Sequence, residues 1–224
     1  MSPPRSKIRL YLLRHGEVSS HHGDVPITED AAKQAEKVGR RFGADVSGIM
    51  TVLCGETQRA RETAEHLSRG IETVGGRVEG PTVAHALRNP DLYLGGHRVN
   101  MVSTSEALAA QVPDLEPEEV AGLEFFPDFL SQPDRVGWWL RHDAPPGEGS
   151  SVVGARIEAF ARSLVNPFRE DRTEVVAVTH SPLLRAMGLA QMGYDIGEPD
   201  WVSGLAIEVD RSGELGADFY PGSG

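Results

Sequence analysis

Short apolar runs alternate with amphipathic stretches along most of this chain. The runs at 8–13, 50–54 and 174–179 are too short for buried helices and rich in branched apolar residues, which is typical of buried strands. Residues 82–87 and 205–209 predict two further strands, the second of them a candidate edge strand. Nearly continuous apolar strands are typical of a sheet that is covered on both faces.

Apolar residues recur at steps of three and four between these runs. Ala31, Ala35, Val38 and Phe42 would share one face of a helix over 28–43. The same reasoning predicts helices over 57–69, 99–111, 136–141, 182–192 and from residue 150 or 151 onward. Strands that alternate with helices predict an α/β fold, a three-layer sandwich with a mainly parallel central sheet and helices on both faces.

Length and composition are those of one globular unit. The chain has 224 residues, of which 39% are hydrophobic and 25% charged. We therefore expect a single domain over residues 1–224. Residues 113–135, rich in Pro, Glu and Phe, are the hardest stretch to assign to an element from the sequence. We expect either a lid or cap excursion over about 88–148 or a simple surface excursion there.

Charge and cysteine content exclude several classes of function. The net charge of −11 argues against nucleic acid and anionic membranes as partners, because both require basic surfaces. A local arginine cluster can still bind a small anion, because distant charges are screened within about 10 Å. Cys54 is the single cysteine, so no intrachain disulfide is expected. With no signal or membrane-spanning segment recognisable, we expect a cytoplasmic protein.

Two of the predicted strands end in a histidine. His15 follows the first strand and His180 the late one, with Arg14 beside the former. Arg59 follows the strand that ends at Cys54. Ligands of open parallel sheets bind beyond the carboxyl ends of the strands, so these side chains are expected at one edge.

These residue types suit phosphoryl transfer. The transferring group spreads negative charge over its equatorial oxygens, which guanidinium groups bind bidentately. An imidazole can attack phosphorus and hold the group covalently, and a second imidazole can stabilise the developing charge.

Taken together, the motifs resemble those of the histidine phosphatase superfamily, also called phosphoglycerate-mutase-like. The matching segments are Leu13-Arg14-His15-Gly16-Glu17, Asp24-Val25-Pro26-Ile27-Thr28, Arg59-Ala60-Arg61-Glu62-Thr63-Ala64, Pro146-Gly147-Glu148-Gly149-Ser150 and Val178-Thr179-His180-Ser181. The resemblance spans about residues 8–190. It implies that His15 is the phosphorylated nucleophile and that Arg14, Arg59 and His180 bind the phosphoryl group. It implies neither a metal nor a cofactor, and structural roles for Asp24, Gln34 and Thr63.

One departure from the family pattern concerns the proton donor. Where the larger branch of the family carries a glutamate general acid, this chain has Asn89. Either Asp91 or Glu106 has taken over, with a pKa raised by burial, and of the two Asp91 is preferred because Pro90 can turn the chain there. Alternatively no acid exists and the substrate is a phosphohistidine or an acyl phosphate. A third reading is a non-catalytic module that binds a phosphorylated ligand.

The leading prediction is a metal-independent phosphatase that hydrolyses a phosphomonoester of a small metabolite. A phosphoglycerate-type mutase is less favoured, because the inserted motif of cofactor-dependent mutases is missing. Glu17, His22, Arg88 and Ser181 are candidate substrate contacts, with His97 a weaker one. The expected partner is a small phosphorylated molecule, and a homodimer is compatible with the sequence.

Overall fold

A six-stranded sheet forms the centre of the computed structural model, which describes residues 8–20, 23–165, 174–210 and 212–222. Its strands, in spatial order, are β3 (Arg77–Val83), β2 (Ile49–Cys54), β6 (Glu174–Thr179), β1 (Ile8–Arg14), β7 (Gly204–Val209) and β8 (Leu215–Tyr220). The neighbours from β3 to β1 run parallel, whereas β7 and β8 pair antiparallel. The sheet is therefore mainly parallel, as the sequence predicted.

The central strands are apolar on both faces because both faces are covered. In β1, Leu10 and Leu12 are buried on one side and Leu13 on the other. In β6, Val175 packs with the former set and Val176 with the latter. Side chains that alternate in this way explain why the runs lack the polar half of a surface strand.

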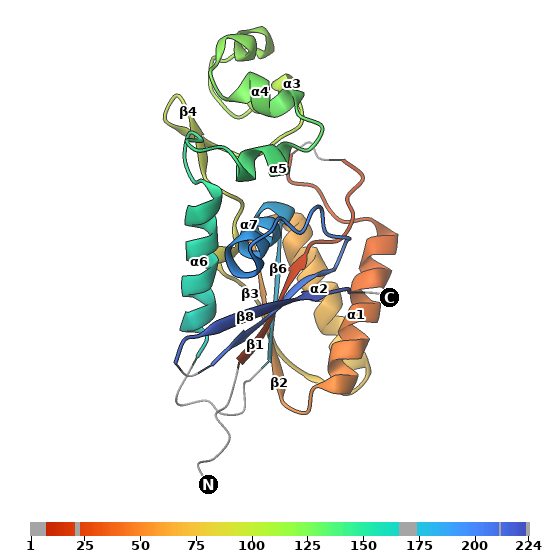
Figure 1. The fold of residues 1–224 in the computed structure, drawn as a ribbon. Helices are drawn as coiled ribbons and strands as arrows, with labels where there is room; N and C mark the ends of the chain where they lie inside the picture. Colours follow the sequence, from red (N-terminus) through yellow and green to blue (C-terminus); the bar gives the residue numbers. More distant parts are fainter. Residues whose placement is uncertain (1–7, 21–22, 166–173, 211, 223–224) are drawn as a thin grey trace.

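Helices cover the two faces in pairs. Figure 1 shows α1 (Glu29–Asp45) and α2 (Gln58–Thr73) on one side of the sheet and α6 (Ser150–Ser163) and α7 (Ser181–Met192) on the other. Thr28 caps α1, since its hydroxyl accepts a hydrogen bond from the Ala31 amide at 3.2 Å. The three-layer sandwich predicted from the sequence is thus confirmed.

Two glycines allow α1 and α2 to cross closely. A Cβ atom on Gly39 would lie 2.1 Å from the Leu67 carbonyl oxygen, and one on Gly70 would lie 2.2 Å from that of Glu36. Contacts this short are incompatible with any side chain, so the two backbones touch directly.

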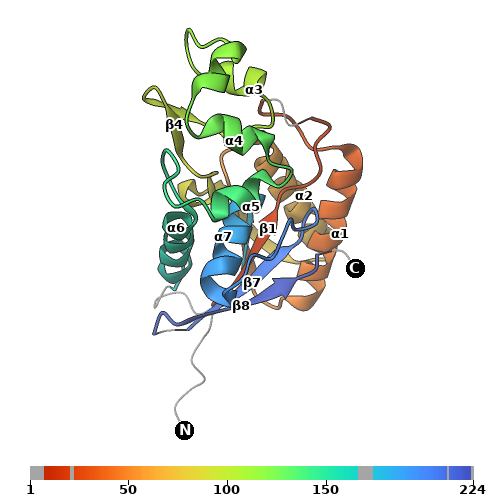
Figure 2. The ribbon, with the colours of Figure 1, turned by 45° about the horizontal axis from the view of Figure 1, so that its top comes forward.

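Residues 88–149, here called the cap, extend beyond the carboxyl ends of the parallel strands (Figures 1 and 2). The chain enters the cap after the 3₁₀ helix η1 (His85–Leu87) and returns to the sandwich in α6. The cap contains β4 (Leu92–Leu94), β5 (His97–Val99), α3 (Ser105–Ala109), the 3₁₀ helix η2 (Pro117–Gly122), α4 (Phe126–Ser131) and α5 (Arg135–Leu140). Phe125 packs its ring against those of Phe129, Trp138 and His142, which gives the cap its own aromatic cluster.

Three predicted elements were wrong in extent or position. The strand predicted over 82–87 is β3, which ends at Val83, and the chain then turns through η1. The helix predicted over 99–111 shrinks to α3, because the Gln111 side chain accepts from the Asn100 amide and closes a loop instead. The strand at 205–209 is not an edge, because β8 pairs antiparallel with its outer side.

Among the described residues, no helix combines the length and apolar character needed to cross a membrane.

We expect Gly39→Ala to lower the free energy of unfolding by about 1–3 kcal/mol, the usual cost of overpacking. Helix propensity alone would change stability by about 1 kcal/mol in the opposite direction, so the sign decides between the two effects. Urea unfolding measures it. Gly122→Ala is the matched control, because a Cβ atom there meets nothing within 4 Å. An unchanged or higher midpoint for Gly39→Ala would show that the helices separate easily.

Candidate active site

The pairing of β1 with β6 brings the two histidines together. Arg14 lies opposite Thr179 in the parallel register, so the residues that follow them are neighbours at the sheet edge. The His15 amide donates to the Thr179 carbonyl at 2.9 Å, and the two imidazole centroids lie 5.3 Å apart in an edge-to-face arrangement. Both side chains are buried.

The backbone after β1 fixes the tautomer of His15. Its Nδ1 lies 2.7 Å from the carbonyl oxygen of Gly16, which can only accept, so Nδ1 carries the proton and Nε2 the lone pair. The Gly16 amide donates to Thr63 Oγ1, and that hydroxyl donates to the Arg59 carbonyl. Thr63 therefore ties the His15 loop to the helix that carries Arg59.

Arg59 lies in the first turn of α2, where Thr57 is the N-cap residue. Burial lowers the pKa of its guanidinium, and the carboxylate of Asp24, 3.8 Å from Nη1, opposes that shift. Its Nε is buried and has no hydrogen-bond partner within the described part of the chain.

Arg14 is held by the connection between α7 and β7. Its Nη1 donates to the Pro199 carbonyl at 2.6 Å, and its Nη2 lies 2.7 Å from Glu198 Oε1. Its guanidinium carbon lies 3.4 Å from the ring centroid of Trp201, a cation–π contact. Nε again has no partner among the described residues. The Trp201 carbonyl in turn accepts from Gln34, so this wall is anchored to α1.

His180 is buried and neutral. Burial, and after it the positive charges of its neighbours, lower its pKa well below the ordinary 6.5. Neither ring nitrogen finds a hydrogen-bond partner in the part of the chain that the structure describes. Gly55 leaves room beside it, since a Cβ atom there would lie 3.4 Å from Nε2 and only 2.9 Å from the Leu87 carbonyl oxygen.

These side chains line a cavity of about 400 Å³, here called the histidine cavity. It is lined by Arg14, His15, Arg59, Asn89, Met101, Val102, Ser103, Phe129, Pro133, Asp134, Arg135, Val136, His180, Ser181, Pro182, Arg185 and Glu198. All four residues expected around the phosphoryl group are in this set. Asn89 is also there, at the place where the family pattern has its acid.

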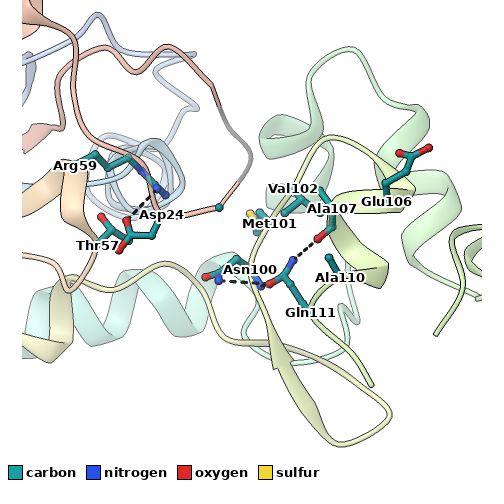
Figure 3. Close-up of a pocket in the computed structure, with 11 residues that line it drawn as sticks. Asp24, Thr57, Arg59, Asn100, Met101, Val102, Glu106, Ala107, Ala110 and Gln111 are labelled. Carbon is teal, nitrogen blue, oxygen red and sulfur yellow. Dashed lines mark hydrogen bonds and ion pairs between the residues drawn. The ribbon is translucent and has the colours of Figure 1, made fainter. Parts of the chain in front are cut away.

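A second cavity of about 410 Å³, the cap cavity, adjoins the first and shares Arg59, Met101 and Val102 with it. Figure 3 shows Asp24 and Arg59 on one side of it and the cap helix α3 on the other.

The two carboxylates considered as general acids lie elsewhere. Asp91 lines neither of the two cavities. Burial alone would raise its pKa, but ion pairs with Arg88 and Arg98 outweigh burial and lower it, which is the opposite of the expected direction. Glu106 is exposed, lines the cap cavity and points away from Arg59 (Figure 3).

The candidate substrate contacts also divide. Ser181 lines the histidine cavity. Arg88 is instead engaged by Asp91 and Glu148, and neither Glu17 nor His97 lines either cavity. His22 lies outside the described residues.

Sequence reasoning missed the residues that brace the histidine cavity. Arg185, on α7, is almost fully buried and pairs with Asp134 at the start of α5 and with Asp195 after α7. The two carboxylates offset the burial and raise the arginine's pKa, and the pKa of Asp134 falls to about 2. A lone charge within an apolar helix that follows the second histidine was a usable signal for Arg185. For Glu198 and Trp201 there was none, because they lie in an irregular connection.

Comparison with known proteins finds one family model that matches part of the chain. Residues 10–79 match the model described as histidine phosphatase superfamily (branch 1), and this stretch contains His15 and Arg59. No curated protein matches the chain.

Solved structures extend the similarity to the whole fold. A mycobacterial glucosyl-3-phosphoglycerate phosphatase in complex with VO3 is 20% identical, with a TM-score of 0.61 over 96% of this chain and 100% of that one. A phosphoglycerate mutase from Bacillus anthracis str. Sterne is 16% identical, with a TM-score of 0.59 over 97% and 94%. A phosphoserine phosphatase mutant from Entamoeba histolytica in complex with phosphoserine is 14% identical, with a TM-score of 0.54 over 96% and 98%. The resemblance to the histidine phosphatase superfamily is confirmed over residues 10–79, and at these identities the solved structures show a shared fold.

We expect His180 to make stability depend on pH. As pH falls below about 6.5, the unfolded chain protonates this histidine while the buried side chain stays neutral, so stability is lost, with a limiting slope of about 1.4 kcal/mol per pH unit. His180→Gln removes that contribution. Urea unfolding between pH 7.5 and 5.5 should therefore show a shallower loss for this variant.

The control is His97→Gln, which changes an exposed histidine outside both cavities and should keep the wild-type slope. Equal slopes for His180→Gln and wild type would mean that His180 is protonated in the folded protein.

Proposed function

We propose that this chain, a relative of the histidine phosphatase superfamily, hydrolyses a phosphomonoester of a small metabolite through a phosphohistidine at His15. The observation that carries the proposal is a set of buried nitrogens without partners among the described residues. Nε of Arg14, Nε of Arg59 and both ring nitrogens of His180 belong to side chains that line one cavity with His15. Unpaired buried polar groups are costly, and an anionic ligand would accept hydrogen bonds from the two Nε–H groups and from the one N–H of neutral His180.

The charges of the cavity suit a phosphoryl group in transfer. Two guanidinium groups supply fixed positive charge, and neutral His180 can donate one further hydrogen bond. Donors that are already in place cost no reorganisation during the reaction, which is how electrostatic stabilisation of a transition state operates.

The nucleophile is prepared by the backbone. Because the Nδ1–H group of His15 donates a hydrogen bond to the Gly16 carbonyl, the lone pair of Nε2 is available for attack. Nε2 would form the bond to phosphorus as the ester P–O bond breaks, and water would then break the P–N bond to release inorganic phosphate. The organic part of the substrate leaves as an alcohol after taking up one proton. The water that attacks the phosphohistidine releases one proton, which restores the balance.

The absence of a metal requirement is part of the proposal. Arg14 and Arg59 supply the charge that a divalent cation supplies in other phosphoryl-transfer enzymes. The two adjoining cavities, of about 400 and 410 Å³, are of the size that binds small molecules, which supports a small-metabolite substrate.

A phosphohistidine or acyl-phosphate substrate is the second candidate. It is favoured by one observation, the amide of Asn89 at the wall of the histidine cavity. Such substrates have good leaving groups and need no proton donor.

We expect His15→Ala to reduce hydrolysis of 4-nitrophenyl phosphate by at least about 1,000-fold, since loss of a nucleophile removes the covalent route. Rapid quench in an alkaline denaturant should trap phosphate that is stable in base and labile in acid on the wild type, and none on the variant. His97→Ala, outside both cavities, is the control and should keep the wild-type rate. Turnover retained by His15→Ala would refute the assignment. A wild type that binds phosphate but is never labelled would indicate a binding module.

We expect exhaustive treatment with EDTA to leave the rate of 4-nitrophenyl phosphate hydrolysis unchanged, because the proposed charges belong to the protein. The measurement compares treated and untreated enzyme after gel filtration. A loss of activity that added magnesium, manganese or zinc restores would contradict metal independence.

A further inference from the structure

The proposed phosphomonoester chemistry needs a proton donor near the leaving oxygen, and few carboxyl groups are placed to act as one. Of the described residues that line the histidine cavity, only Asp134 and Glu198 carry carboxylates. Asp134 is bound by both terminal nitrogens of Arg185 at 2.7 Å, and its pKa of about 2 keeps it ionised. Glu198 differs in how it is held: one of its oxygens lies 2.7 Å from Nη2 of Arg14 and the other 3.7 Å from Nη1 of Arg185, whereas both oxygens of Asp134 are bound at 2.7 Å. Glu198 is therefore the candidate that remains.

Glu198 bridges the immediate neighbours of both histidines. Its Oε1 lies 2.7 Å from Nη2 of Arg14, the residue before His15. Its Oε2 accepts a hydrogen bond from the hydroxyl of Ser181, the residue after His180. These contacts hold the carboxyl group at the wall of the cavity in which the phosphoryl group would be bound.

The carboxyl group also has access to solvent and to the substrate. Its side chain is 49% exposed, so it can exchange protons with water between catalytic cycles. The guanidinium of Arg14 already contacts Glu198, and it is also expected to bind the phosphoryl oxygens of the substrate. When the substrate binds, two anions would face one guanidinium, and like charges this close favour a shared proton.

We infer that Glu198 is the general acid that protonates the leaving alcohol, in place of the carboxyl group that Asn89 lacks. This inference rests on the proposed function. As Nε2 of His15 bonds to phosphorus and the P–O ester bond breaks, the Glu198 proton moves to the leaving oxygen and the alcohol departs. The resulting carboxylate then takes a proton from the water that attacks phosphohistidine, so that phosphate is released and Glu198 is protonated again.

The test compares two leaving groups. In 4-nitrophenyl phosphate the leaving phenolate needs little help from an acid, whereas glycerol 2-phosphate must release an alkoxide. Glu198→Gln keeps the shape of the side chain and an oxygen for Ser181 but cannot give up a proton. We expect it to lower kcat/KM for glycerol 2-phosphate by about 100- to 10,000-fold, and for 4-nitrophenyl phosphate by less than about tenfold.

Two further variants sharpen the experiment. Glu198→Asp retains a proton donor on a shorter side chain and should recover part of the activity toward glycerol 2-phosphate. Glu118→Gln makes the same chemical change on an exposed cap residue that lines neither cavity and should behave as wild type toward both substrates. Circular dichroism and thermal unfolding check that each variant is folded.

Other outcomes overturn the inference in distinguishable ways. Equal losses for both substrates would mean that Glu198 only positions Arg14. Unchanged or faster turnover with tighter inhibition by vanadate would mean that its carboxylate competes with the substrate. A wild type active on 4-nitrophenyl phosphate but inactive on glycerol 2-phosphate would leave the phosphatase proposal standing and remove the acid. A wild type inactive on both would refute both proposals.

Discussion

The parallel pairing of β1 with β6 is the constraint on which the site depends. Because Arg14 lies opposite Thr179, the two strands end at the same level and His15 and His180 follow side by side. The β2 strand pairs with the other edge of β6 and ends level with it, which brings Gly55 and the helix carrying Arg59 to the same place. A slip of this register by one residue would turn every strand side chain to the opposite face and separate the histidines.

Cationic side chains gathered in a buried cavity are unfavourable in the absence of an anion, so the surrounding fold must hold them there. Arg14 stacks on Trp201 and is bound by Glu198, while Arg59 is drawn toward Asp24. These contacts use the terminal nitrogens of the guanidinium groups and leave the Nε atoms without a hydrogen-bond partner in the described ranges of the chain. The protein thereby stabilises the arginines only in part, and a bound phosphoryl group would complete their interactions.

Local rules were sufficient for the sandwich and for the histidine motifs. Apolar runs located the central strands, and Thr28 marked the start of α1, because strand burial and helix capping act over a few residues. The expected acid at Asp91 was a different matter: burial alone would raise its pKa, but Arg88, three residues earlier, and Arg98, which reaches it once the β4–β5 hairpin has formed, together lower it. Glu198 likewise depends on how the chain after α7 folds back. Pairings between distant segments leave no periodic signal in the sequence.

The buried Arg185 joins the cap to the sandwich, since it lies on α7 and binds Asp134 at the start of α5. The outer cap elements, η2 and α4, contact α3, α5 and each other, and they contribute little to the edge of the sheet that carries the histidines. Substitutions in η2 and most of α4 therefore leave the histidine edge of the sheet largely unchanged. Evolution can vary this part of the cap, provided that Arg185 keeps its attachment to Asp134.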